Sequence, residues 1–250
     1  MNHLRELMDT PAERWLIPGE VADRDAFAVW GDMQKFGVQA QCFWLGEVED
    51  TDGLQVIPEL CRLPYGVCWF EVACTTDERH WIVGALVVAT PSTTRMIGFR
   101  KLAGTWELRY VTDMEQFGAG QMWTLPAEQR AAEEAKAVRL KIAAFLSALH
   151  CSNVRRQEHA PDAKLQKARA KRGKAPLFSY WTLQLDGKSE RGADQGGTHA
   201  SPRVHLRRGH PRQYSPGKWT WVQAHAVGNR AAGVVHKDYS AGPALAVAAR

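Results

Sequence analysis

Two histidines and three arginines lie close together in the run HLRRGHPR at residues 205–212. An imidazole takes or gives a proton near neutral pH, and a guanidinium group binds phosphate oxygens through paired hydrogen bonds. The run therefore fits two chemistries. It can grip a phosphate backbone, or it can cleave RNA without a metal, with His205 and His210 as acid and base. In the second case Arg207 or Arg208 would stabilise the charged phosphorane.

The geometry of this run depends on the element that carries it. In an extended strand, His205 and Arg207 lie on one face, while Arg208 and His210 lie on the other. A bulge at Gly209 would bring His210 round beside His205. Other candidate groups follow downstream. The catalytic candidates are His205, His210, Arg207, Arg208, Lys237 and Tyr239.

A second basic feature precedes this run, at residues 164–174, where six of eleven residues are Lys or Arg and none is acidic. Such a density of cations neutralises phosphates and releases counterions, although a solvated linker has the same composition. Aromatic side chains at 214, 219 and 221 offer stacking faces for unpaired bases. The predicted nucleic-acid contacts are Lys164, Lys167, Arg169, Lys171, Arg172, Lys174, Arg203, Arg207, Arg208, Arg212, Tyr214, Trp219 and Trp221.

The charge of the whole chain is divided between its two parts. Residues 1–150 carry 14 Lys/Arg against 21 Asp/Glu, a balance of −7, whereas residues 151–250 carry 18 against 6, a balance of +12. The two balances sum to the total of +5. A basic segment of this density indicates a polyanionic partner.

Several other classes of protein are disfavoured. The five cysteines are odd in number and lack zinc-site or redox spacing, which indicates a reduced, intracellular setting. The chain has no phosphate-binding glycine motif and no His-Glu-x-x-His, so we expect no cofactor and no metal. The longest apolar stretch, 81–89, is too short to cross a bilayer. We therefore expect a protein of the host bacterial cytoplasm with no membrane span; its oligomeric state is left open.

Strand-like and helical segments alternate along the acidic part. Apolar residues at helical spacing predict a helix over 23–36, and β-branched and aromatic runs predict four or five antiparallel strands. A long helix over 127–149 is expected to cover one face of that sheet. The predicted strand segments are 41–48, 66–74, 80–90, 93–102 and 105–112.

These elements predict an α+β fold, an antiparallel β-meander covered by a long helix. The predicted organisation is an acidic α+β domain at 1–150, a basic linker at 151–176 and a smaller, basic, β-rich module at 177–250.

The order of motifs in the C-terminal part resembles that of an uncharacterised family of phage and prophage proteins with no assigned activity. The shared pattern is HxRRGHxR, then GKxxWV, VG and GxVxKDY, and here it reads SPRVHLRRGHPR, GKWTWV, VG and GVVHKDY. The segments 164–185 and 63–72 are also similar to theirs. One departure is Ala175, where a proline often precedes Pro176. The resemblance implies a viral or mobile-element origin and a compact β-module displaying His205, His210, Arg207 and Arg208.

Three hypotheses of function remain. The first is a phage-type accessory protein that binds DNA or RNA through its basic C-terminal module. The second is a metal-independent ribonuclease, and the third is an inhibitor of a host defence complex, which would make a host protein complex the partner.

Overall fold

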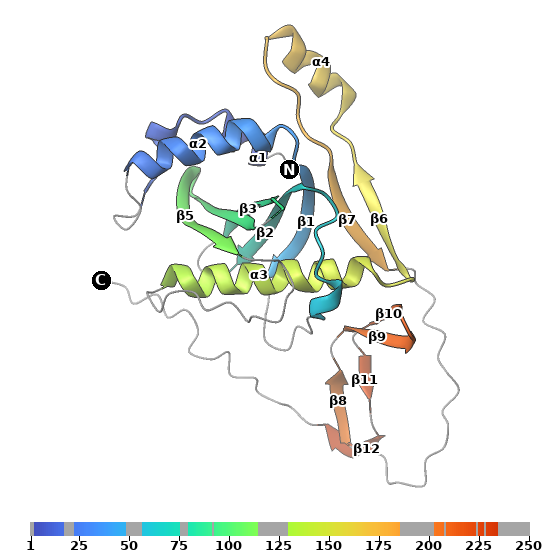
Figure 1. The fold of residues 1–250 in the computed structure, drawn as a ribbon. Helices are drawn as coiled ribbons and strands as arrows, with labels where there is room; N and C mark the ends of the chain where they lie inside the picture. The colour runs from blue at the N-terminus through green and yellow to red at the C-terminus, as the bar shows by residue number, and fades with distance from the viewer. Residues whose placement is uncertain are drawn as a thin grey trace.

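Figure 1 shows the fold of the chain in a computed structural model. The structure describes residues 3–17, 23–48, 57–75, 80–91, 93–114, 130–185, 203–207, 209–223, 225–227 and 229–234. It is a mixed α/β structure with a seven-stranded sheet and four α-helices among these residues. The predicted mixture of helices with a large sheet is confirmed at that level.

The large sheet has the strand order β5-β4-β3-β2-β1-β7-β6. Strands β2 to β5 are joined in sequence, and each pairs antiparallel with the next. Strand β1 (Gln41–Val48) instead runs parallel to both of its neighbours, β2 and β7. The four antiparallel strands are β2 (Val67–Thr75), β3 (His80–Ala89), β4 (Thr94–Leu102) and β5 (Thr105–Met114).

Helices cover both faces of this sheet, because its central strands are apolar on both sides. On one face pack α1 (His3–Met8), the 3₁₀ turn Ala12–Arg14 and α2 (Asp23–Gly37), through side chains such as Leu7 and Met33. On the other face packs α3 (Arg130–Leu149), through Val138, Ile142 and Phe145. A second 3₁₀ turn, Pro58–Leu60, contacts α3.

Two glycines let aromatic rings cross the sheet surface. A Cβ at Gly84 would lie 2.2 Å from the Trp69 ring, and a Cβ at Gly98 would lie 2.0 Å from the Tyr110 ring. No side chain fits at either position without moving the ring, so glycine allows the close packing of these large residues.

The predicted linker at 151–176 contains regular structure. Strand β6 (Val154–His159) and helix α4 (Ala163–Lys171) form there, and β6 pairs antiparallel with β7 (Tyr180–Leu185) over six residue pairs. Strand β7 begins after the predicted boundary at 177, yet it belongs to the large sheet. The reason is that its side chains pack on both cores, Tyr180 on one side and Trp181 and Leu183 on the other.

The remaining strands form two small sheets. Strands β9 (His210–Ser215) and β10 (Lys218–Val222) make an antiparallel hairpin. Strand β8 (Arg203–Arg207) pairs with β11 (His225–Val227) and β12 (Asn229–Val234). The hairpin is fixed to the end of α3, since the Ser152 amide donates to the Trp219 carbonyl at 2.9 Å and Asn153 makes two hydrogen bonds to the Trp221 backbone.

Candidate nucleic-acid interface

One basic structure with an exposed helix is the segment Val154–Leu185, which comprises β6, α4 and β7 and which we call the arm. Strands β6 and β7 run beside each other, and α4 lies beyond their ends, at the top of Figure 1. None of the residues of α4 is buried. The segment 154–176 carries eight Lys/Arg and two Asp/Glu, a balance of 8 − 2 = +6.

Local signals explain why a helix forms without a core. Its residues, AKLQKARAK, are almost all strong helix formers. Asp162 caps the N-terminus by accepting a hydrogen bond from the Leu165 amide at 2.9 Å. At the other end Gly173 has a φ of +64°, and the Gly173 and Lys174 amides donate to the carbonyls of Ala170 and Arg169. These two bonds form a Schellman motif, which stops the helix.

One face of α4 is attached to the rest of the chain. The Gln166 side chain donates to the Leu177 carbonyl and accepts from the Leu177 amide, both at 2.9 Å. One turn later, Arg169 donates to the Ala175 carbonyl at 2.9 Å and to the Asp9 carboxylate at 3.3 Å. The helix is therefore held to the returning chain and to the loop after α1.

The opposite face carries three lysines. Lys164, Lys167 and Lys171 are three and four residues apart, so they share one side of the helix, and all three are exposed. We call them the lysine face. Arg172 and Lys174 follow the helix and are exposed too. Five of the six cations predicted in this window thus face solvent, and Arg169 is the one paired with Asp9.

Strand β6 adds two cations that the sequence interpretation did not select. Arg155 and Arg156 are exposed on this edge strand. Arg156 donates to the Tyr65 hydroxyl at 3.1 Å, and its guanidinium lies 5.7 Å from the centre of the Trp181 ring. The sequence signal for these contacts was the pair of adjacent arginines in the run VRRQEH, which lacks the alternation of apolar and polar residues typical of a half-buried strand.

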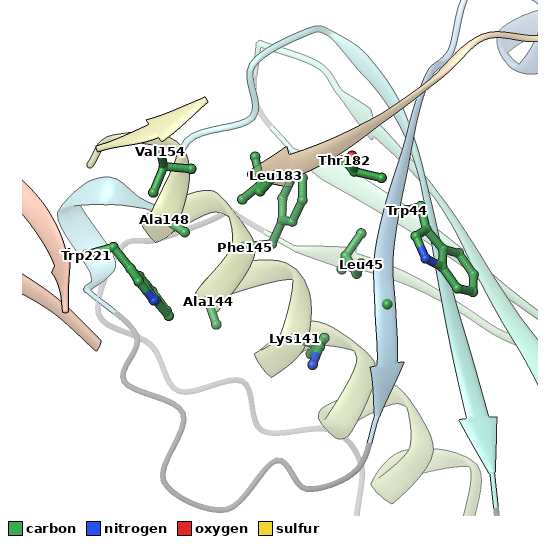
Figure 2. A pocket seen from close by; sticks show the side chains of 11 residues that line it. Trp44, Leu45, Lys141, Ala144, Phe145, Ala148, Val154, Thr182, Leu183 and Trp221 are labelled. Atoms are coloured by element: carbon green, nitrogen blue, oxygen red, sulfur yellow. The ribbon is translucent and has the colours of Figure 1, made fainter. Parts of the chain in front are cut away.

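The β9–β10 hairpin separates the predicted contacts into two faces. Arg212 pairs with Thr220 and His210 with Val222, so both basic residues share one face. Arg212 and Tyr214 are exposed, whereas His210 is half-buried. Trp219 and Trp221 pair with Gln213 and Pro211 on the other face. The Trp221 side chain lines a pocket together with Ala144 and Ala148 of α3, as Figure 2 shows.

The backbones of the two histidines in the predicted acid–base pair lie on different strands. His205 lies on β8 and His210 on β9, and these strands belong to different sheets. The backbone places Arg203 and Arg207 on β8 as well, and the side chains of these three β8 residues lie outside the described part of the structure. Arg208, Lys237 and Tyr239 also lie outside it. The ribonuclease hypothesis therefore stays a prediction, as does the hypothesis of a host protein target.

A pocket of about 380 Å³ opens at the root of the arm (Figure 2). Its walls come from β1, α3 and β7, and it is closed on one side by Trp221. Ten of its eleven lining residues are uncharged, the exception being Lys141. This pocket could not be predicted, because it depends on how β1, β7 and the hairpin meet.

A buried carboxylate lies under α1, on β2. Glu71 is 6% exposed, and it accepts a hydrogen bond from the Trp69 indole at 2.8 Å while His3 Nδ1 lies 3.1 Å from its other oxygen. Both oxygens are thus engaged within the core, which is the usual requirement for burying an acid. The arrangement anchors α1 to the sheet.

The four buried cysteines are not built as nucleophiles. All five are free thiols, and four of them are buried. Burial raises the pKa of Cys68 to about 12 and that of Cys151 to about 11. Burial, followed by the nearby Glu71, also raises the pKa of Cys42. A thiol that keeps its proton near neutral pH is a poor nucleophile.

The described residues contain no group of three or more His, Cys, Asp or Glu side chains that could hold a metal ion. Within the same residues, no helix combines the length and the apolar character needed to span a bilayer.

Comparison with known proteins gives no relative, since no family model, curated protein or solved structure matches this chain. The resemblance to phage and prophage proteins stays a prediction from the motifs, and the candidate site is judged on its own geometry.

Proposed function

We propose that the protein binds nucleic acid by its phosphate backbone, with the lysine face of the arm as the main contact surface. The observation that carries this proposal is the division of α4 into two sides. Gln166 and Arg169 hold one side to the chain, while Lys164, Lys167 and Lys171 remain exposed on the other.

The dimensions of this face suit a polyanion. Residues 164 to 171 span seven steps of 1.5 Å along the helix axis, or about 10 Å. Phosphates of one DNA strand follow one another at about 3.4 Å along the duplex axis, so this face can meet about three of them. Because α4 stands beyond the ends of β6 and β7 (Figure 1), a long polymer can approach it without meeting the body of the protein.

The charge of the chain supports a backbone-binding mode rather than base reading. The arm has a charge balance of +6, which comes from lysines and arginines. It contains one short helix, α4, and not the two helices of a helix-turn-helix motif. Contacts of this type neutralise phosphates regardless of sequence. In this proposal the protein acts in the cytoplasm of a bacterial host, as an accessory protein of viral or mobile-element origin.

Charge removal at two matched places tests the proposal. The arm variant replaces Lys164, Lys167 and Lys171 by Gln. The control variant replaces the exposed Arg14, Lys35 and Arg62 by Gln, which removes the same charge from the body. Binding is followed by fluorescence anisotropy of labelled 30-mers, as duplex DNA, single-stranded DNA and single-stranded RNA, at about 0.1 M salt.

We expect the arm variant to bind about 10- to 100-fold more weakly than the wild type. Each lost phosphate contact lowers the number of counterions released on binding by about 0.7 to 0.9. The control variant should stay within about threefold. Equal losses in both variants would mean that net charge alone matters and would contradict a dedicated surface. Because α4 buries no residue, the thermal unfolding of both variants should match that of the wild type.

A further inference from the structure

The pocket at the root of the arm forms where two strands separate. Strands β1 and β7 are parallel, and their register covers two residue pairs, Cys42 with Tyr180 and Phe43 with Trp181. The next two residues of each strand line the pocket: Trp44 and Leu45 on β1, and Thr182 and Leu183 on β7. Figure 2 shows the two strands diverging around it. Their facing main-chain edges therefore border the hollow.

Small residues keep the hollow open. Ala144 and Ala148, one turn apart on α3, line the floor, and Gly46 lines the side formed by β1. Larger side chains at these positions would fill the space between α3 and the strands. The volume of about 380 Å³ lies within the range of pockets that take small ligands.

The walls match a flat, aromatic group attached to an anion. Trp221 closes one side and Phe145 lies across α3 from it, as Figure 2 shows. Lys141 is the charged residue of the lining, and it is a cation. The hairpin that supplies Trp221, residues 209–223, has no acidic residue.

The pocket is also continuous with the proposed interface. Val154, Thr182 and Leu183 of the arm belong to its lining. From Val154, strand β6 leads about 17 Å to His159, just before α4. Arg155 and Arg156 are exposed along that path. A strand whose phosphates follow the arm would bring a base to the pocket.

We propose that this pocket binds one unpaired base of a single-stranded nucleic acid, stacked on Trp221, with Lys141 near the adjoining phosphate. This inference rests on the proposed function, because the arm supplies the backbone contacts. The Trp221 ring can stack on any of the bases. The main-chain groups of β1 and β7 that border the pocket can form hydrogen bonds with the polar edge of the bound base.

The test separates the base from the backbone. Labelled dT15 is compared with a 15-mer of the same charge that has abasic sites throughout, and U15 RNA is run beside dT15 to distinguish DNA from RNA. We expect the wild type to bind dT15 or U15 at least fivefold more tightly than the abasic strand, in line with stacking of a single base.

Two variants should remove this preference and leave binding of the abasic strand unchanged. Trp221→Ala removes the stacking face, and Ala148→Leu fills the hollow while keeping the ring. Trp30→Ala is the matched control, since Trp30 is an exposed tryptophan of α2 that does not line the pocket. It should retain the preference.

The outcomes separate the two proposals. If the wild type binds the abasic strand as tightly as dT15 and U15, the pocket takes no base, and the inference is overturned while backbone binding stands. If Trp221→Ala lowers the preference and Ala148→Leu does not, the ring acts outside the hollow, and the inference is overturned too. If the wild type binds none of the three strands, the proposed function itself fails.

Discussion

Arg169 illustrates how one cation of a basic run is used inside the molecule while its neighbours stay outside. Its guanidinium contacts the Ala175 carbonyl and the Asp9 carboxylate. Because Asp9 is about half exposed, this ion pair contributes at most about 1 kcal/mol to stability. Its role is to orient α4, which leaves the lysine face pointing to solvent.

At Gly98 the addition of a single methyl group should lower the free energy of unfolding. The Gly98→Ala variant would place a Cβ 2.0 Å from the buried Tyr110 ring, so the ring or the strand must move. We expect the free energy of unfolding to fall by about 1–3 kcal/mol, the usual cost of overpacking. Urea denaturation followed by circular dichroism measures it.

Gly31→Ala is the control for this prediction. Gly31 lies on α2 with open space where a Cβ would stand, so the variant should gain about 0.5–1 kcal/mol from helix propensity. A Gly98→Ala protein as stable as the wild type would show that Tyr110 does not pack on β4 in this way.

The buried thiols predict how stability depends on pH. Cys68 and Cys151 have folded-state pKa values raised to about 12 and about 11, against about 8.5 for an unfolded thiol. Above about pH 8.5 the unfolded chain loses these protons and the folded chain keeps them. Stability is therefore complete below that pH and falls by about 1.4 kcal/mol per pH unit and per thiol above it.

Urea denaturation between pH 8 and pH 10.5 checks this. The Cys68→Ala variant should show a shallower fall than the wild type, because one of the titrating thiols is gone. An identical slope in the two proteins would mean that Cys68 is not shielded from water.

The arm is the element whose position matters most for the proposed function. Its attachment to the large sheet is short, at two residue pairs between β7 and β1. Side chains strengthen it: Arg5 Nε donates to the Pro176 carbonyl at 3.0 Å, and the Arg5 guanidinium lies 4.6 Å from the centre of the Phe178 ring. The segment between α4 and β7 is thus fixed to α1, and α4 is held by Gln166 and Arg169.

Removing the Gln166 side chain should loosen α4 and the chain that follows it, without affecting the large sheet. The Gln166→Ala variant loses both hydrogen bonds to Leu177, while the helix keeps its caps and gains a better helix former. We expect trypsin to cut after Lys171, Arg172 or Lys174 several-fold faster, with no change in global unfolding. A cleavage rate equal to that of the wild type would contradict this role.

The elements differ in how far the sequence predicts them. The strand segments between 66 and 112 carry apolar and aromatic residues on both faces, and β2 to β5 form at those places. Strand β6 and helix α4 have little apolar character, so composition indicates a linker there. The caps were nevertheless visible in the sequence, with Asp162 before the basic window and Gly173 near its end.

The candidate site is predicted only in part, for a similar reason. The exposed cations at 164–174 follow from composition, because a window without apolar residues has nothing to bury. Which of them is paired does not follow, since Asp9 is 160 positions away in sequence. The pocket depends on the separation of β1 from β7 and on the place where Trp221 packs. Local sequence patterns predict neither of these features.

At the scale of the whole molecule, the acidic and basic parts are not simply folded onto each other. Arg169 and Asp9 join the two, but the lysine face, Arg172 and Lys174 stay exposed. Helix α4 lies beyond one end of β6 and the β9–β10 hairpin lies near the other, as Figure 1 shows. The basic surface therefore extends along one edge of the molecule, where a polyanion can follow it.

Salt dependence of binding tests this account most directly. Affinity for a labelled single strand is measured across about 50–300 mM salt for the wild type and for the variant with Lys164, Lys167 and Lys171 replaced by Gln. The five exposed cations at residues 164–174 predict a slope of log K against log salt of about −3 to −4, and the variant should be less steep by about 2. An affinity that stays constant as salt rises, or the same slope in both proteins, would contradict the claim that the arm binds phosphates.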